Sequence, residues 1–150
     1  MYIKKQFLLI AILLVSVQAL AQNKFSDYEI EHLKFVASGE SSSTSISELG
    51  TAQNELGIRY ANGSKGVSKN IEEAAYWFLQ GASNGNKYAQ NNIAWRYYEG
   101  YGVTKDLAEA LYWFDRSGKQ NFYEAALMAG KMYFYGEGTE VNYYKALRCF

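Results

Sequence analysis

The stretch "RYYEGYGVTKDLAEALYWF", residues 96–114, places Gly100 and Gly102 between two segments whose apolar residues recur at helical spacing. A glycine-rich turn of this kind either cradles an anionic ligand or connects two packed helices. An anion cradle usually has a lysine at the start of the following helix. That pattern is absent here, and the acidic Asp106 and Glu109 would repel a phosphate. We therefore expect a helix–turn–helix unit, with Gly100 left-handed at the end of the first helix and Gly102 helping to reverse the chain.

The same unit occurs three times along the chain. Related segments begin at Ala52, Ala89 and Ala125, at offsets of 37 and 36 residues. Each segment is followed by two glycines, a polar residue and a second apolar segment. The glycine pairs are Gly63 with Gly66, Gly100 with Gly102, and Gly136 with Gly138, and the polar residues are Asn70, Asp106 and Asn142. Self-similarity at this period predicts an array of helix pairs.

The second helix of each unit has a predicted start and a predicted core face. Asn70 with Glu73, and Asp106 with Glu109, resemble a capping box with Asx in place of Ser or Thr. A stripe at i, i+3 and i+4 then recurs, which indicates a buried face. Its members are Ala74, Trp77 and Phe78; Ala110, Trp113 and Phe114; and Ala146, Cys149 and Phe150.

The first helix of each unit carries a very small residue at one equivalent position. Gly57, Ala94 and Gly130 occupy it. Glycine inside a helix costs roughly 1 kcal/mol relative to alanine, so its presence needs a packing reason. We interpret the position as a point where a neighbouring helix approaches closely.

These motifs together resemble the Sel-one-like repeat, a tetratricopeptide-type helix pair. The A-x-x-x-L-G-x-x-Y string of residues 52–60, the G-V turn and the Trp77-Phe78 pair carry the resemblance. It implies an all-α, right-handed solenoid of antiparallel helix pairs with repeats at about 51–86, 87–121 and a truncated 122–150. It also implies a concave surface for protein partners and no cofactor. The disulfide-rich members of the family carry paired cysteines, which this chain lacks, so we expect no β-lactam-directed activity.

The third repeat stops at Phe150, without a segment matching residues 79–82. Two interpretations stay open. The sequence is a truncated one, or its end is an exposed apolar surface that pairs with something, self-association included. An array of this type usually needs about three repeats and a polar capping helix.

The first 21 residues have the pattern of a secretory signal. Lys4 and Lys5 precede an apolar run over residues 7–17, and residues 19–21 form an A-x-A cleavage site. The run is well short of the roughly 20 residues that span a bilayer, so we expect export to the periplasm or beyond, with no transmembrane segment after cleavage. An uncleaved anchor is the alternative. The chain balances 15 basic against 15 acidic residues, which argues against nucleic-acid binding.

Residues 22–50 contain no repeat and predict an N-terminal cap. A short amphipathic helix is expected over 27–36, followed by a flexible serine-rich loop over 38–47. His32 has no second histidine to pair with, so it is interpreted as a cap residue and not a metal ligand. Cys149 is the sole cysteine and is interpreted as a packed helix residue. No catalytic or metal-binding group is expected.

The resemblance implies that first-helix residues not needed for packing face the concave side. These candidate groove residues are Asn54, Ile58 and Ala61; Asn91, Trp95, Tyr98 and Glu99; and Leu127, Lys131 and Phe134. Asn54 and Asn91 recur and could clamp an extended peptide backbone, and Trp95 and Tyr98 are typical interface anchors. The aromatic residues could instead only thicken the core.

The predicted function is therefore an exported interaction module that binds a peptide or protein partner and is not an enzyme. The alternative is an envelope saccharide-binding or peptidoglycan-modifying protein that uses the same aromatic groove. A hydrolytic saccharide site would need two carboxylates at a set separation. The sequence supplies the aromatic rings without a clear carboxylate pair.

Overall fold

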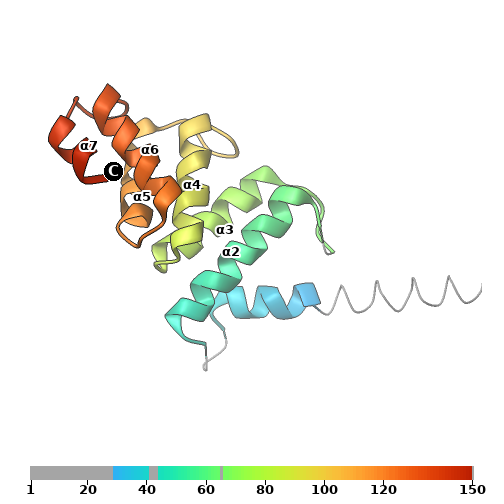
Figure 1. Ribbon diagram of the computed structural model, residues 1–150. Helices are drawn as coiled ribbons and strands as arrows, with labels where there is room; N and C mark the ends of the chain where they lie inside the picture. The colour runs from blue at the N-terminus through green and yellow to red at the C-terminus, as the bar shows by residue number, and fades with distance from the viewer. Residues whose placement is uncertain (1–28, 41–43, 65, 150) are drawn as a thin grey trace, which may run out of the picture.

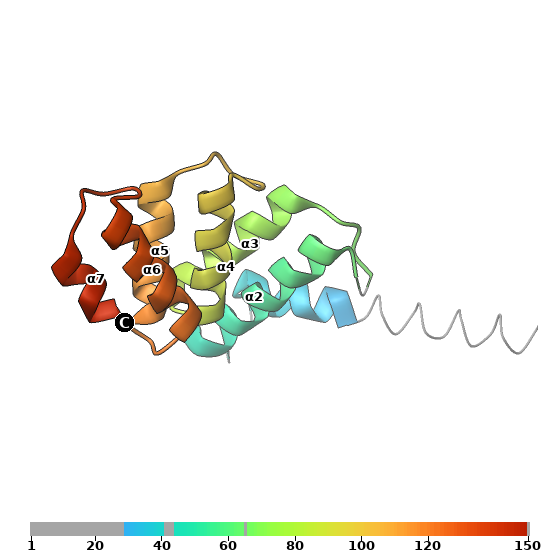
Figure 2. The same ribbon diagram turned by 45° about the horizontal axis from the view of Figure 1, so that its top comes forward.

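The computed structural model describes residues 29–40, 44–64 and 66–149, and all regular structure within these ranges is helical. A helix over residues 29–38 comes first. The labelled helices are α2 (Ile46–Asn62), α3 (Ile71–Ser83), α4 (Lys87–Glu99), α5 (Leu107–Gly118), α6 (Tyr123–Tyr135) and α7 (Tyr143–Cys149). They stack as helix pairs in an elongated array (Figure 1), and the turns within the pairs follow one another along one edge (Figure 2). The predicted all-α solenoid is confirmed.

The first helix of each pair ends where the sequence predicts. Gly63, Gly100 and Gly136 follow α2, α4 and α6 with φ of 66°, 74° and 74°, the left-handed conformation in which glycine carries no Cβ penalty. Each glycine N–H donates to a carbonyl four residues back, which satisfies one of the open acceptors at the helix end. The glycines of the turns are therefore connectors between packed helices.

The second helices begin at the predicted polar caps. The Asn70 Oδ1 accepts from the Glu73 N–H at 3.0 Å, and the Asp106 Oδ1 accepts from the Glu109 N–H at 3.0 Å. Asn142 caps α7 in the same way. A side-chain acceptor here satisfies a backbone donor that the helix leaves open.

The other half of the expected capping box is wrong. The N–H of each cap residue donates to a tyrosine carbonyl at the end of the preceding helix, and the N–H groups of Asn70 and Asp106 therefore do not donate to the carboxylate three residues on. The bonds join Asn70 to Tyr60 at 2.9 Å, Asp106 to Tyr97 at 3.0 Å, and Asn142 to Tyr133 at 2.8 Å. The turn folds the cap residue back against the end of the preceding helix. The tyrosine carbonyl there accepts the hydrogen bond from the backbone N–H of the cap residue.

The second glycine of the second and third turns lies against the preceding repeat. A Cβ built on Gly102 would stand 2.3 Å from the carbonyl oxygen of Ile71, and one on Gly138 would stand 2.3 Å from that of Leu107. Both glycines also have positive φ, 82° and 71°. The backbone of one repeat therefore packs directly on the start of the second helix of the repeat before it, and only glycine leaves room.

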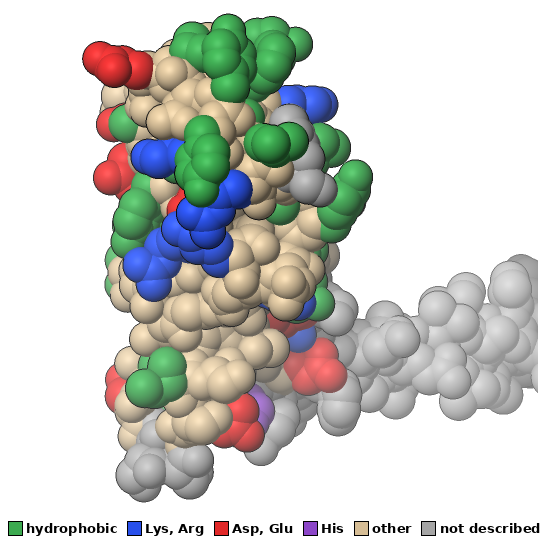
Figure 3. All heavy atoms as spheres, turned by 60° about the vertical axis from the view of Figure 1, so that its left-hand side comes forward, with side chains coloured by type: hydrophobic (Ala, Val, Ile, Leu, Met, Phe, Trp, Pro, Cys, Tyr) green, Lys and Arg blue, Asp and Glu red, His purple; other side chains and the backbone are tan. Residues whose placement is uncertain are grey.

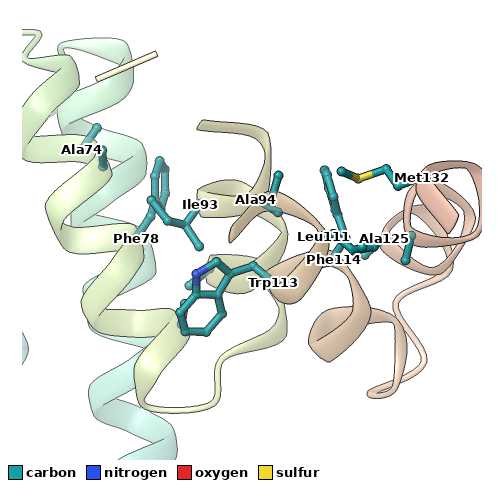
Figure 4. Packing of buried hydrophobic residues seen from close by; sticks show 14 residues of the cluster. Ala74, Phe78, Ile93, Ala94, Leu111, Trp113, Phe114, Ala125 and Met132 are labelled. Atoms are coloured by element: carbon teal, nitrogen blue, oxygen red, sulfur yellow. The ribbon is translucent and has the colours of Figure 1, made fainter. Parts of the chain in front are cut away.

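The core follows the predicted stripe. Ala74, Phe78, Ala110 and Phe114 are all at most 2% exposed. Figure 4 shows Phe78 and Phe114 among residues of the first helices such as Ile93 and Met132. The close approach predicted at Gly57 is confirmed, because a Cβ there would lie 2.6 Å from the Phe78 ring.

The helix over residues 29–38 closes the N-terminal end of the array. Ile30 and Ala37 are 3% and 1% exposed and form a cluster with Leu56 of α2, against which Trp77 packs. The expected N-terminal helix is thus confirmed where the structure describes it. The predicted signal segment lies outside the described residues.

The predicted loop over 38–47 is too long at both ends. Residue 38 still belongs to the preceding helix, and α2 starts at Ile46. The cause is a full capping box: the Glu48 N–H donates to the Ser45 Oγ at 3.3 Å, and the Ser45 N–H donates to the Glu48 Oε2 at 2.9 Å. These bonds from Ser45 lower the pKa of Glu48. The S-x-x-E pattern at 45–48 was readable in the sequence.

Two buried glutamines join neighbouring helices. The Gln90 Nε2 donates to the Ala82 carbonyl at 3.1 Å, and its Oε1 accepts from the Gln120 Nε2 at 2.8 Å. In the preceding repeat, the Gln53 Nε2 donates to the Ala37 carbonyl, and the Gln53 Oε1 accepts from the Asn84 Nδ2. The third repeat has Ala126 at this position and so lacks the bonds.

We predict that Gly102→Ala lowers the free energy of unfolding by about 2–4 kcal/mol, because the methyl group adds overpacking against Ile71 to the strain of positive φ. Gly85→Ala is the matched control. Gly85 has φ of 85° but nothing within 4 Å of a built Cβ, so its loss should stay near about 1–2 kcal/mol. Urea unfolding followed by circular dichroism measures both. Equal losses would show that the contact between repeats contributes nothing.

We predict that Gln90→Met costs about 1–3 kcal/mol of unfolding free energy, because the Ala82 carbonyl and the Gln120 amide lose their partner. Gln120→Met, at the exposed end of the same pair, should cost less than the Gln90 change. Thermal and urea unfolding of the two variants provide the comparison. A neutral Gln90→Met would mean that packing alone joins these helices.

Candidate functional site

The candidate groove residues of α4 form a rigid aromatic pair. The Trp95 and Tyr98 rings meet edge to face with centroids 5.6 Å apart, and Trp95 meets Phe114 in the same way at 5.2 Å. The Tyr98 hydroxyl donates to the Glu137 Oε2 at 3.2 Å, across to the turn of the third repeat. Burial and then this carboxylate raise the pKa of Tyr98. Both side chains are half-buried, so they pack on the core and also present a surface.

The recurring asparagines are arranged differently from the predicted clamp. The partner of the Asn54 Oδ1 is the Asn92 Nδ2, at 3.0 Å, which joins α2 to α4. Asn91 is only 8% exposed, and its Oδ1 is buried without a hydrogen-bond partner. The structure thus brings together Asn54 and Asn92, while Asn91 lies inside.

The remaining candidate residues divide by exposure. Ile58 and Ala61 are half-buried against the core cluster, and Leu127 is half-buried on α6. Glu99, Lys131 and Phe134 are exposed. The Phe134 ring meets those of Tyr135 and Tyr143 edge to face, at 5.0 Å and 5.2 Å. Whether this surface binds a partner stays a prediction.

Sequence reasoning missed the recurring arginine of the first helices. The Arg96 guanidinium lies 4.8 Å from the Tyr101 ring centroid and 5.5 Å from that of Phe78, which is within reach of a cation–π attraction. Burial lowers its pKa. Arg59 stands at the same repeat position and is 8% exposed. The repeated Arg-Tyr dipeptides at 59–60 and 96–97 were the available signal.

A pocket lies between α5, α6 and α7. It has a volume of about 610 Å³, and its polar lining includes Asp115, Lys119, Lys145 and Arg148. Figure 3 shows Lys and Arg side chains gathered at this end of the molecule beside hydrophobic ones. No expectation from the sequence pointed to this pocket.

Cys149 also lines this pocket and is not an activated nucleophile. Burial, followed by the nearby charge of Asp115, raises the pKa of its thiol, and so disfavours the thiolate. Within residues 29–40, 44–64 and 66–149, no three His, Cys, Asp or Glu side chains are grouped to hold a metal ion. Across those same ranges, no helix is both long enough and apolar enough to cross a membrane.

Comparison with known proteins supports the architecture. The Sel1 repeat model matches residues 50–86, 87–122 and 124–150. A Sel1 repeat protein from Oxalobacter formigenes is 30% identical, with a TM-score of 0.67 over 89% of this chain and 52% of its own length. A protective antigen present in uropathogenic Escherichia coli strains, displaying an SLR fold, is 25% identical, with a TM-score of 0.64 over 89% of this chain and 31% of its own.

This chain therefore spans about half or less of either solved structure. No curated protein matches it. The family model nevertheless covers nearly the whole helical array, and its three matches coincide with the helix pairs α2–α3, α4–α5 and α6–α7. The chain belongs to the Sel1 repeat family.

Proposed function

We propose that this chain is an exported, non-enzymatic interaction module that binds an extended segment of a partner protein along α2, α4 and α6. Sel1 repeats are generally protein–protein interaction modules. The observation that carries the proposal is the half-exposed Trp95–Tyr98 pair on α4, held in place by Phe114 and Glu137. A binding surface that is already fixed loses little conformational freedom when a partner docks.

The neighbouring polar groups suit a peptide backbone. The Asn54–Asn92 pair places side-chain amides between α2 and α4, and an amide both donates and accepts hydrogen bonds. On α6, the exposed Lys131 and Phe134 add a cation and an aromatic ring. Aromatic anchors surrounded by polar groups are the usual composition of a binding hot spot.

Export is proposed on the pattern of residues 1–21, with Lys4 and Lys5, the apolar run and the A-x-A site. The destination is the periplasm or the exterior.

We predict that the double variant Lys131→Glu, Phe134→Ala weakens partner binding at least about tenfold, because it reverses one charge and removes one aromatic anchor. Both side chains are exposed, so circular dichroism should stay unchanged. The measurement is cross-linking and pull-down from envelope and culture fractions, followed by titration of the purified partner.

The matched control is Glu72→Lys with Tyr76→Ala, an exposed charge and an exposed ring on the second helix α3. It should bind like the parent chain. If both double variants weaken binding equally, the partner does not use the first helices. A partner-free chain whose tryptophan fluorescence responds to peptidoglycan fragments would favour the saccharide alternative instead.

A further inference from the structure

Three of the residues that line the pocket between α5, α6 and α7 are smaller than their counterparts in the first two repeats. Gln53 and Gln90 become Ala126, Leu56 and Ile93 become Ala129, and Trp77 and Trp113 become Cys149. All three replacements line the pocket. In the first two repeats these positions hold large side chains, of which Leu56 and Ile93 are fully buried. The third repeat thus has a pocket of about 610 Å³ where the others have packed atoms.

The pocket also carries more positive charge than the equivalent region of the first two repeats. Glu73 and Glu109 become Lys145, and Tyr76 and Tyr112 become Arg148. Both new cations line the pocket from α7, and neither forms an ion pair within the part of the chain that the structure describes. Lys119 is the third cation, and Asp115 binds it. The pocket therefore keeps two uncompensated positive charges.

Apart from Asn121, the remaining lining residues are apolar or aromatic. Ala126 and Ala129 of α6 line one side, and the Tyr133 ring lies 5.1 Å from the Lys145 Nζ. The volume falls within the range of roughly 300–1,000 Å³ that small-molecule sites occupy. Cations on one wall and apolar surface on the other suit a ligand with one anionic end and one apolar end.

We propose that this pocket binds a carboxylate carried on an aromatic or branched apolar body. The Arg148 guanidinium and the Lys145 ammonium bind the carboxylate, for which a planar guanidinium offers two parallel donors. The apolar body lies against Ala126, Ala129 and Tyr133. A free carboxylic acid and the last residue of a peptide chain share this chemistry. The proposal does not rest on the groove, because none of the candidate groove residues lines the pocket.

The test is a nuclear magnetic resonance titration of the full chain with N-acetylphenylalanine and its amide. The carboxylate should bind with a dissociation constant of about 1 mM or tighter, and the amide at least about tenfold more weakly. A tetrapeptide ending in phenylalanine identifies the source: tighter binding than N-acetylphenylalanine assigns a chain terminus, and equal or weaker binding assigns a free acid. Equal binding of acid and amide, or no binding of either at about ten times that concentration, overturns the proposal.

Two variants and one matched control test whether the ligand binds in this pocket. Lys145→Gln with Arg148→Gln should weaken binding at least about tenfold, whereas Lys34→Gln with Lys69→Gln removes the same charge elsewhere and should leave it unchanged. Cys149→Trp restores the residue of the other repeats and should abolish binding while the protein stays folded by circular dichroism. Unchanged binding in the first variant, or displacement of the carboxylate by equimolar inorganic phosphate, contradicts the proposal.

Discussion

The stacking of the repeats depends on the contact of a turn glycine with a backbone carbonyl one repeat earlier. Gly102 on Ile71 and Gly138 on Leu107 leave no room for a Cβ. This contact fixes how far each helix pair stands from the one before it. Phe78 and Phe114 fill space between the helices and are almost completely buried there. The glycine contact therefore sets both the spacing of the helix pairs and the space that core side chains can fill.

Much of this fold could be predicted from the sequence because it is local. The caps at Asn70 and Asp106 and the glycine at 100 act within a few residues of themselves. The role of Gly102 could not be predicted, since its contact is with a helix some thirty residues away. Trp95 and Tyr98 could be named from the sequence as residues of one helix, and their rings do meet, but their role in binding stays a prediction. The burial of Asn91 could not be predicted, because a shift of one residue, about 100° around the helix axis, decides whether Asn91 or Asn92 meets Asn54.

The three repeats share one backbone arrangement but differ in the side chains that fill the space beside each second helix. The first two fill the space beside each second helix with a tryptophan, while the third leaves it open and positively charged. A repeat array tolerates such divergence because each unit touches only its neighbours. Binding chemistry can therefore differ from one repeat to the next without disturbing the stacking, and the groove and the pocket can serve different ligands.

The buried glutamines have a consequence for how the array comes apart. Gln53 joins α2 to the N-terminal helix, and Gln90 joins the second pair to the first, but Ala126 leaves the third pair without such a bond to the second. In a linear array, stability is a sum of repeat terms and nearest-neighbour terms. The second and third repeats are joined instead by the packing of α6 on α5 and by the hydrogen bond from Tyr98 to Glu137. A buried hydrogen bond adds to local stability, so the amide hydrogens of α6, which lacks this bond, should exchange with solvent earlier than those of α4.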